Sequence, residues 1–257
     1  MNTAAPILAT IALWFASTAL IVWLANRARS TFPASLMIGA LAGAGGLLLI
    51  VDTAADRGPA AAYLSFIGAL CVWGWHELAF LTGAVAGTRR KHASGARGWA
   101  RFREGTAAVI HHEIALAATA VLLLSLSWGE PNQTGAAAFA LLFALRLSAK
   151  LNIFLGVPNI SDELLPIHLT YLKSYFGRPR FTAVLALSLI GSVALAAWLG
   201  LRAATTGEAG AALLFALAAL GALEHLFLAL PLRDSALWRW AIPARRQTSH
   251  EGGGYGL

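Results

Sequence analysis

Seven long apolar stretches constrain the fold of this chain more than any other feature of its sequence. They cover residues 7–25, 36–51, 60–87, 105–128, 134–155, 181–201 and 208–230. Each is close to the roughly 20 residues that a helix needs to cross the hydrocarbon core of a bilayer. A backbone in lipid must satisfy its polar groups internally, so these stretches are predicted to be helices. The sequence therefore predicts an all-α, polytopic membrane bundle of seven transmembrane helices.

The composition agrees with a multi-pass membrane protein. Of the 257 residues, 58% are hydrophobic and 12% are charged, and this charged fraction is about half of that in a soluble domain. The single cysteine, Cys71, lies inside the third stretch and has no partner for an internal disulfide. Gly39 and Gly43 have the G-x-x-x-G spacing that is typical of closely packed membrane helices.

The basic residues are distributed unevenly over the predicted loops. Fifteen of the 19 Lys and Arg residues lie after the first, third and fifth stretches or in the C-terminal tail, while Arg57 and Arg202 lie on the other side. Because basic loops mark the cytoplasmic side, we expect a periplasmic N-terminus and a cytoplasmic C-terminus. Residues 1–233 are predicted to form the bundle and residues 234–257 a cytoplasmic tail with a disordered end.

The net charge of +7 is explained by this topology and by attraction to anionic lipid headgroups. The basic residues are spread over several loops and form no separate domain. The expected partner of the basic surface is therefore the lipid bilayer and no nucleic acid.

Ionisable residues interrupt four of the apolar stretches at one depth. With a rise of 1.5 Å per residue, they lie roughly 12–18 Å from the predicted cytoplasmic ends of their helices. Charged side chains in a membrane usually face the bundle interior and pair with one another, so we expect one cluster, here called the polar layer. Its members are His76, Glu77, His112, Glu113, Arg146, Lys150, Glu224 and His225.

The residues alone leave three interpretations of the polar layer open. In the first, the layer is a buried ion network that fixes helix register. In the second, it is a site for a ligand such as a tetrapyrrole, because a neutral imidazole can bind the metal of that ring. The third interpretation is a catalytic metal site, because three His–Glu neighbour pairs supply enough donors. Against it, neighbours on a helix diverge by about 100°, and the Glu-x-x-His spacing of di-iron bundles is missing.

Residues 156–180 are too polar for a span and too long for a simple turn. Ser161, followed by two acidic residues, is typical of a helix start. Apolar side chains then recur at helical spacing, at Leu165, Leu169, Leu172 and Phe176. We expect a short amphipathic helix near residues 160–177 on the cytoplasmic membrane surface. It either packs under the bundle or provides a docking surface for a partner.

Four strings of the sequence resemble the PuhE family: WGWHELAFLTG from Trp73, HHE from His111, RLSAKLNIFLGVPN from Arg146 and LPIHLTYLKSYF from Leu165. Members of that family are integral membrane proteins of anoxygenic phototrophic bacteria. They are encoded beside the reaction-centre H subunit and are described as photosynthetic complex assembly proteins. The resemblance extends from about the first apolar stretch to Arg233.

The resemblance implies an assembly factor for the reaction centre–light-harvesting 1 complex in the bacterial inner, or intracytoplasmic, membrane. Its partners would be reaction-centre or light-harvesting subunits, or other assembly factors. The resemblance makes bacteriochlorophyll or another tetrapyrrole a candidate ligand of the polar layer. It supplies no catalytic residues. We therefore expect a non-catalytic role. The alternative is a membrane metalloenzyme, an oxidase or hydroxylase that acts on a pigment or a pigment precursor.

Overall fold

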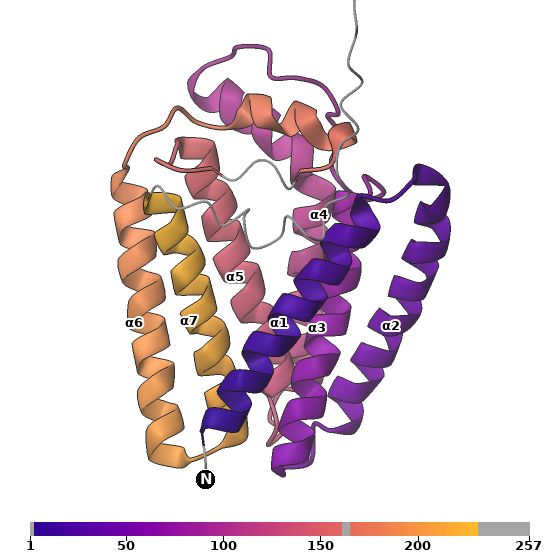
Figure 1. Cartoon of the computed structure of the whole chain (residues 1–257), viewed down its shortest axis with the longest axis vertical. Helices are drawn as coiled ribbons and strands as arrows, with labels where there is room; N and C mark the ends of the chain where they lie inside the picture. Colours follow the sequence, from indigo (N-terminus) through magenta and orange to yellow (C-terminus); the bar gives the residue numbers. More distant parts are fainter. Residues whose placement is uncertain (1–2, 161–164, 231–257) are drawn as a thin grey trace, which may run out of the picture.

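The computed structural model describes residues 3–160 and 165–230, and the described chain is a bundle of long helices (Figure 1). The seven longest are apolar enough to cross a membrane. They are α1 (Ala4–Ala25), α2 (Phe32–Asp52), α3 (Pro59–Leu81), α4 (Gly98–Leu126), α5 (Thr134–Leu155), α6 (Ala183–Thr206) and α7 (Ala209–Ala229). Two 3₁₀ helices, η1 (Arg29–Thr31) and η3 (Ile167–Tyr175), complete the described part, which contains no strand. The predicted all-α bundle of seven membrane-spanning helices is confirmed.

Several predicted helix boundaries are wrong. α3 ends at Leu81 and not at residue 87, because Gly83 takes a left-handed conformation with φ of 78° and turns the chain. α4 begins at Gly98 instead of residue 105, so Arg101 lies in its first turn. α6 continues to Thr206 instead of residue 201 and ends at Gly207, whose φ is 66°.

The core of the bundle surrounds α3, which is the most buried of the seven helices. Phe66 of α3, Phe139 of α5 and Leu213 of α7 are completely buried and belong to one continuous apolar cluster. Large apolar side chains on the outer faces of the helices are exposed, for example Leu41 of α2 and Leu187 of α6. An apolar exterior around a packed core is the surface that contact with lipid requires.

α2 and α3 approach each other so closely that their backbones touch. A Cβ atom at Gly46 would lie 2.4 Å from the carbonyl oxygen of Gly68, so neither position accepts a larger residue without displacement. Gly39 and Gly43 pack against the Trp75 side chain, and a Cβ at either would lie within 3.3–3.4 Å of it. The predicted close packing at these glycines is confirmed, and the narrowest point lies about one turn further along α2.

The chain between α3 and α4 folds back onto α4 instead of continuing α3. The His112 N–H donates to the Ala86 carbonyl at 3.0 Å, and the Arg89 N–H donates to the Ala107 carbonyl at 3.1 Å. A Cβ at Gly87 would lie 2.2 Å from the Ala107 oxygen, so only glycine fits this contact. Residues 82–87 are therefore apolar because they are packed against α4, and not because they belong to a longer span.

η3 lies across the end of the bundle where α3 and α4 are connected (Figure 1). Its apolar side chains are buried against Phe80, Ala86 and Ala108, and they are Leu169, Tyr171, Leu172 and Tyr175. The predicted amphipathic segment is thus a 3₁₀ helix that packs against the bundle with this face. The expected helix start at residues 161–163 and the expected tail at residues 234–257 lie outside the described residues.

Candidate functional site

The eight residues of the polar layer come from α3, α4, α5 and α7, and four of them form a connected chain. Arg146 donates through Nη1 to Glu224 Oε1 at 2.9 Å, and its Nη2 lies 3.8 Å from Glu77 Oε2. The other oxygen of Glu77 lies 3.8 Å from Nε2 of His112. Arg146 on α5 thus connects the carboxylates of α3 and α7, and Glu77 extends the chain to α4.

A separate ion pair lies between α4 and α5. Lys150 Nζ donates to Glu113 Oε1 at 2.6 Å, and the ammonium group also lies 5.4 Å from the centre of the Phe80 ring. Lys150 and Arg146 are one helical turn apart on α5, so the same face of this helix supplies both cations. Their partners are three carboxylates, which leaves the layer short of one positive charge if every carboxylate is ionised. One proton or one cation near Glu77 would restore neutrality.

His225 is not part of this chain of ion pairs. Its Nδ1 lies 2.8 Å from the Gly221 carbonyl and its Nε2 lies 3.0 Å from the Ser148 hydroxyl. Because a carbonyl can only accept, Nδ1 carries the proton and Nε2 accepts from the hydroxyl. Both ring nitrogens are therefore occupied, and this histidine has no free lone pair for a metal or a pigment.

His76 also lies outside the chain of ion pairs. It forms a hydrogen bond with Thr119, with 3.0 Å between Nε2 of the histidine and Oγ1 of the threonine. Its ring packs edge-on against Trp75 and Phe139. Thr119 and Ser148 are not among the site residues predicted from the sequence. Thr119 lies seven residues after His112, on the same face of α4 two turns along, and this spacing is the signal that identifies it.

His112 is the most unusual residue of the polar layer. Its side chain is completely buried, and neither ring nitrogen has a hydrogen-bond partner among the described residues. The ring of Phe80 stacks on it with 4.5 Å between ring centres. Glu77 Oε1 and Glu113 Oε2 are buried without a hydrogen bond as well. Buried polar atoms are nearly always bonded, so the contact between His112 and Glu77 is the best candidate for a functional site in this layer.

The packing of the layer bears on two of the predicted ligands. In the described part of the chain, no group of three or more His, Cys, Asp or Glu side chains is arranged to hold a metal ion. The metalloenzyme hypothesis therefore gains no geometric support there. A tetrapyrrole does not fit beside His112 in this packing, because the histidine is surrounded by protein on all sides. Access for a large planar ring therefore requires the elements packed around His112 to move apart.

Fold and site together define a polytopic helical membrane protein with a partly buried ionic layer shared by four helices. The chain belongs to the family described as "Protein of unknown function (DUF3623)", and the match covers residues 1–249. It is 37% identical over 246 residues to a Rhodobacter capsulatus protein described as "Uncharacterized 30.4 kDa protein in puhA 5'region". That alignment covers 92% of this chain and 90% of the relative. No solved structure matches the chain significantly.

Proposed function

We propose that this protein is an integral membrane assembly factor for the reaction centre–light-harvesting 1 complex of a phototrophic bacterium. The observation that carries the proposal is the position of the relative's gene in the 5′ region of puhA, a photosynthesis gene. The relative matches nearly the whole chain, so a related role is expected for the whole bundle. The PuhE resemblance of the sequence points to the same class of protein, and the intracytoplasmic membrane is the corresponding location.

Within this role, the polar layer has two tasks. The pairs of Arg146 with Glu224 and of Lys150 with Glu113 connect α4, α5 and α7 within the membrane. Such pairs set the register of helices, because a charge that slips out of register loses its partner in lipid. The second task belongs to Glu77 and His112, whose unbonded atoms can take up a proton, or a polar group of a client once the bundle opens.

Handling of bacteriochlorophyll at this layer is the more specific form of the proposal. His112 is the candidate axial ligand that the geometry favours, because it retains unbonded ring nitrogens while His225 uses both of its own. Pigment binding would require an opened state of the bundle, in which the elements packed around His112 move apart. The assembly role itself does not depend on this step.

The test is removal of the gene from its host and complementation under phototrophic conditions. Near-infrared absorption of the membranes measures assembled complexes, and immunoblotting measures the protein itself. The deletion should lower the complexes and the unchanged gene should restore them. A deletion strain with normal complexes would contradict the proposed function.

Variants of Glu77 separate a functional site from a purely structural network. Glu77→Gln preserves shape but removes the charge, and should lower the complexes more than the protein level. Glu77→Gln leaves two carboxylates, Glu113 and Glu224, for the two cations of the layer, so the variant protein should remain in the membrane. An equal loss of protein and of complexes would leave only the structural role. Glu130→Gln, an exposed change between α4 and α5, is the matched control and should behave as the unchanged protein.

A further inference from the structure

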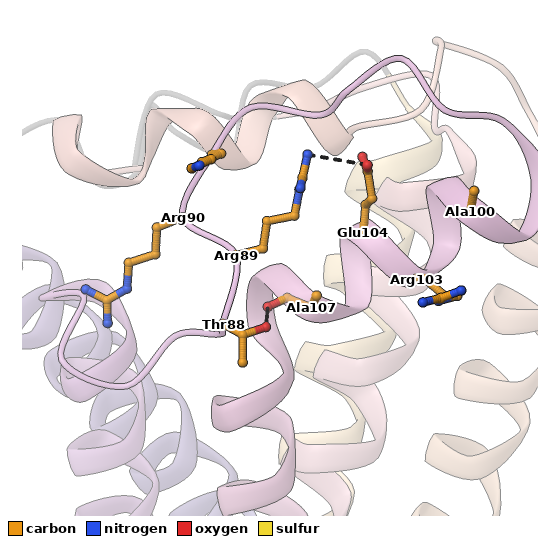
Figure 2. A pocket seen from close by; sticks show the side chains of 8 residues that line it. Thr88, Arg89, Arg90, Ala100, Arg103, Glu104 and Ala107 are labelled. Atoms are coloured by element: carbon orange, nitrogen blue, oxygen red, sulfur yellow. Dashed lines mark hydrogen bonds and ion pairs between the residues drawn. The ribbon is translucent and has the colours of Figure 1, made fainter.

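A cavity of about 640 Å³ lies beside the first turns of α4, outside the polar layer (Figure 2). One wall is the extended chain after α3 and the other is α4 itself. Its lining residues are Thr88, Arg89, Arg90, Lys91, Ala100, Arg103, Glu104 and Ala107. This cavity, here called the basic cavity, is thus lined by four cations and one carboxylate. Arg89 points toward Glu104, while the side chains of Arg90 and Arg103 extend away from it on opposite sides (Figure 2).

The cations of the basic cavity differ in how they are held. Arg89 lies 3.4 Å from Glu104 and donates through Nε to the Tyr175 hydroxyl at 2.8 Å. Arg90, Lys91 and Arg103 are exposed, and no carboxylate of the described residues pairs with them. Glu104 thus neutralises one guanidinium and fixes its position, while three positive charges remain available to an anion.

The walls of the cavity are fixed by backbone contacts and not by flexible side chains alone. The Arg89 N–H and the Thr88 hydroxyl both bond to the Ala107 carbonyl, at 3.1 and 3.3 Å. The missing Cβ of Gly87 allows this segment to lie directly on α4. The backbone that carries the first of the cations is therefore held against α4, so one wall of the cavity is already formed before a ligand binds.

The depth of the basic cavity indicates where its ligand comes from. α4 has 29 residues and is thus about 43 Å long, whereas the hydrocarbon core of a bilayer is about 30 Å thick. Its first turns carry Arg101, Arg103 and Glu104, and such charged side chains place this end of the helix in the headgroup region. Trp99 is 70% exposed there and stacks on Phe102 with 5.0 Å between ring centres. Exposed aromatic rings of this kind are typical of the membrane interface.

We propose that the basic cavity binds the phosphate group of an anionic phospholipid from the surrounding bilayer. Arg90, Lys91 and Arg103 bind the phosphate, and Arg89 is a positioning residue held by Glu104 and Tyr175. Basic pockets at the ends of membrane helices bind such headgroups through several cations at once. The exposed aromatic pair beside the cavity favours a lipid over a phosphate dissolved in water.

The experiment uses the full-length protein in vesicles of equal parts phosphatidylglycerol and phosphatidylcholine, with one of the two lipids brominated. Bromine quenches nearby indoles, and the difference between the unchanged protein and Trp99→Phe isolates the signal of Trp99. Brominated phosphatidylglycerol should quench it at least about fivefold more efficiently, since each nearby cation contributes on the order of one kcal/mol toward an anionic lipid. Equal quenching by the two lipids would overturn the proposal.

Two triple variants make the test specific for the cavity. Replacing Arg90, Lys91 and Arg103 by Gln should abolish the preference for phosphatidylglycerol. The matched control replaces Arg27, Arg97 and Arg178, three exposed arginines of the described chain that do not line the cavity. This control should retain the preference for phosphatidylglycerol. An equal loss of the preference in both variants would show that it comes from the general surface charge, and would refute a specific site. If the first variant does not fold, Arg103→Gln alone should lower the preference in the same direction.

A competition with inorganic phosphate distinguishes a lipid from a soluble anion. Millimolar phosphate should leave the quenching by phosphatidylglycerol unchanged, because a headgroup in the bilayer is present at a much higher local concentration. Displacement of the lipid by millimolar phosphate, with sulfate as the control for ionic strength, would overturn the lipid assignment.

Discussion

His168 connects η3 to the end of α3 through a single hydrogen bond. Its Nε2 donates to the Leu81 carbonyl at 2.8 Å, one of the last carbonyls of α3, which have no partner within the helix. Burial lowers the pKa of His168 below its ordinary value, and the positive charge of Arg29 acts in the same direction, although the bond to Leu81 opposes them. The neutral ring is therefore the form that holds η3 in place.

Docking of η3 should weaken as the pH falls below about 6.5, the ordinary pKa of histidine. Above that pH, His168 is neutral whether η3 is docked or free, and the docking energy is constant. Below it, the free segment takes up a proton that the docked segment resists, so docking loses stability. After correction for the intrinsic exchange rate, which itself slows as the pH falls, the protection of the amides of residues 167–175 should decrease between pH 7 and pH 5. His168→Gln keeps a donor without the titration, and an equal loss of protection in this variant would refute the explanation.

The polar layer shows what single residues reveal before a structure is known. The rise per residue predicted that eight ionisable side chains share one depth, and the residues do come from four packed helices. Depth says nothing of rotation about each helix axis, so it could not identify partners. Arg146 lies closer to Glu224 than to Glu77, and His225 faces Ser148 on α5. These partners depend on how the helices pack, which no single helix specifies.

At the scale of elements, α2 is attached to the bundle mainly through its glycine face on α3. Gly46 is one of its few buried residues, and most of the helix faces outward. Close packing of small residues replaces the hydrophobic effect here, because lipid is as apolar as the helix surface. The sequence predicted this face from glycine spacing. It could not predict that α3 ends at Leu81, because the contact of Gly87 with α4 is a tertiary one.

Gly46→Ala should destabilise the protein by about 1–3 kcal/mol, the usual cost of overpacking a tight contact. The new methyl group would meet the Gly68 carbonyl at 2.4 Å and force the two helices apart. Gly45→Ala is the matched control on the same helix, since its Cβ would meet nothing within 4 Å. Unfolding of the purified protein in detergent, followed by circular dichroism, measures both. Equal midpoints for the two variants would contradict the proposed contact.

At the scale of the whole molecule, basic side chains gather at one end of the bundle. The α3–α4 connection, the first turns of α4 and the segment around η3 all carry them there, whereas the opposite end has Arg57 and Arg202. The structure confirms the seven helices on which the predicted topology depends. The orientation of the bundle in the membrane stays a prediction. It places the basic end in the cytoplasm, because basic loops are preferentially cytoplasmic.

Reporter fusions test that orientation directly. A fusion after Gly95, in the α3–α4 connection, should be active with a cytoplasmic reporter. A fusion after Gly129, at the exposed turn between α4 and α5, should be active with a periplasmic one. Alkaline phosphatase and green fluorescent protein report the two compartments. Fluorescence from the Gly129 fusion would refute the proposed orientation.

The backbone contact between Gly46 and Gly68 also bears on the order in which the protein is built. α2 and α3 are consecutive, so they can pair as a hairpin soon after both have left the ribosome. Glu77 enters the bilayer with this hairpin, long before Arg146 is made. At about 5–20 residues per second, the 69 residues from Leu78 to Arg146 take roughly 3–14 s to synthesise. During that interval the growing chain holds an acidic side chain in the membrane without its future arginine, and Glu224 closes the network only when the last helix arrives.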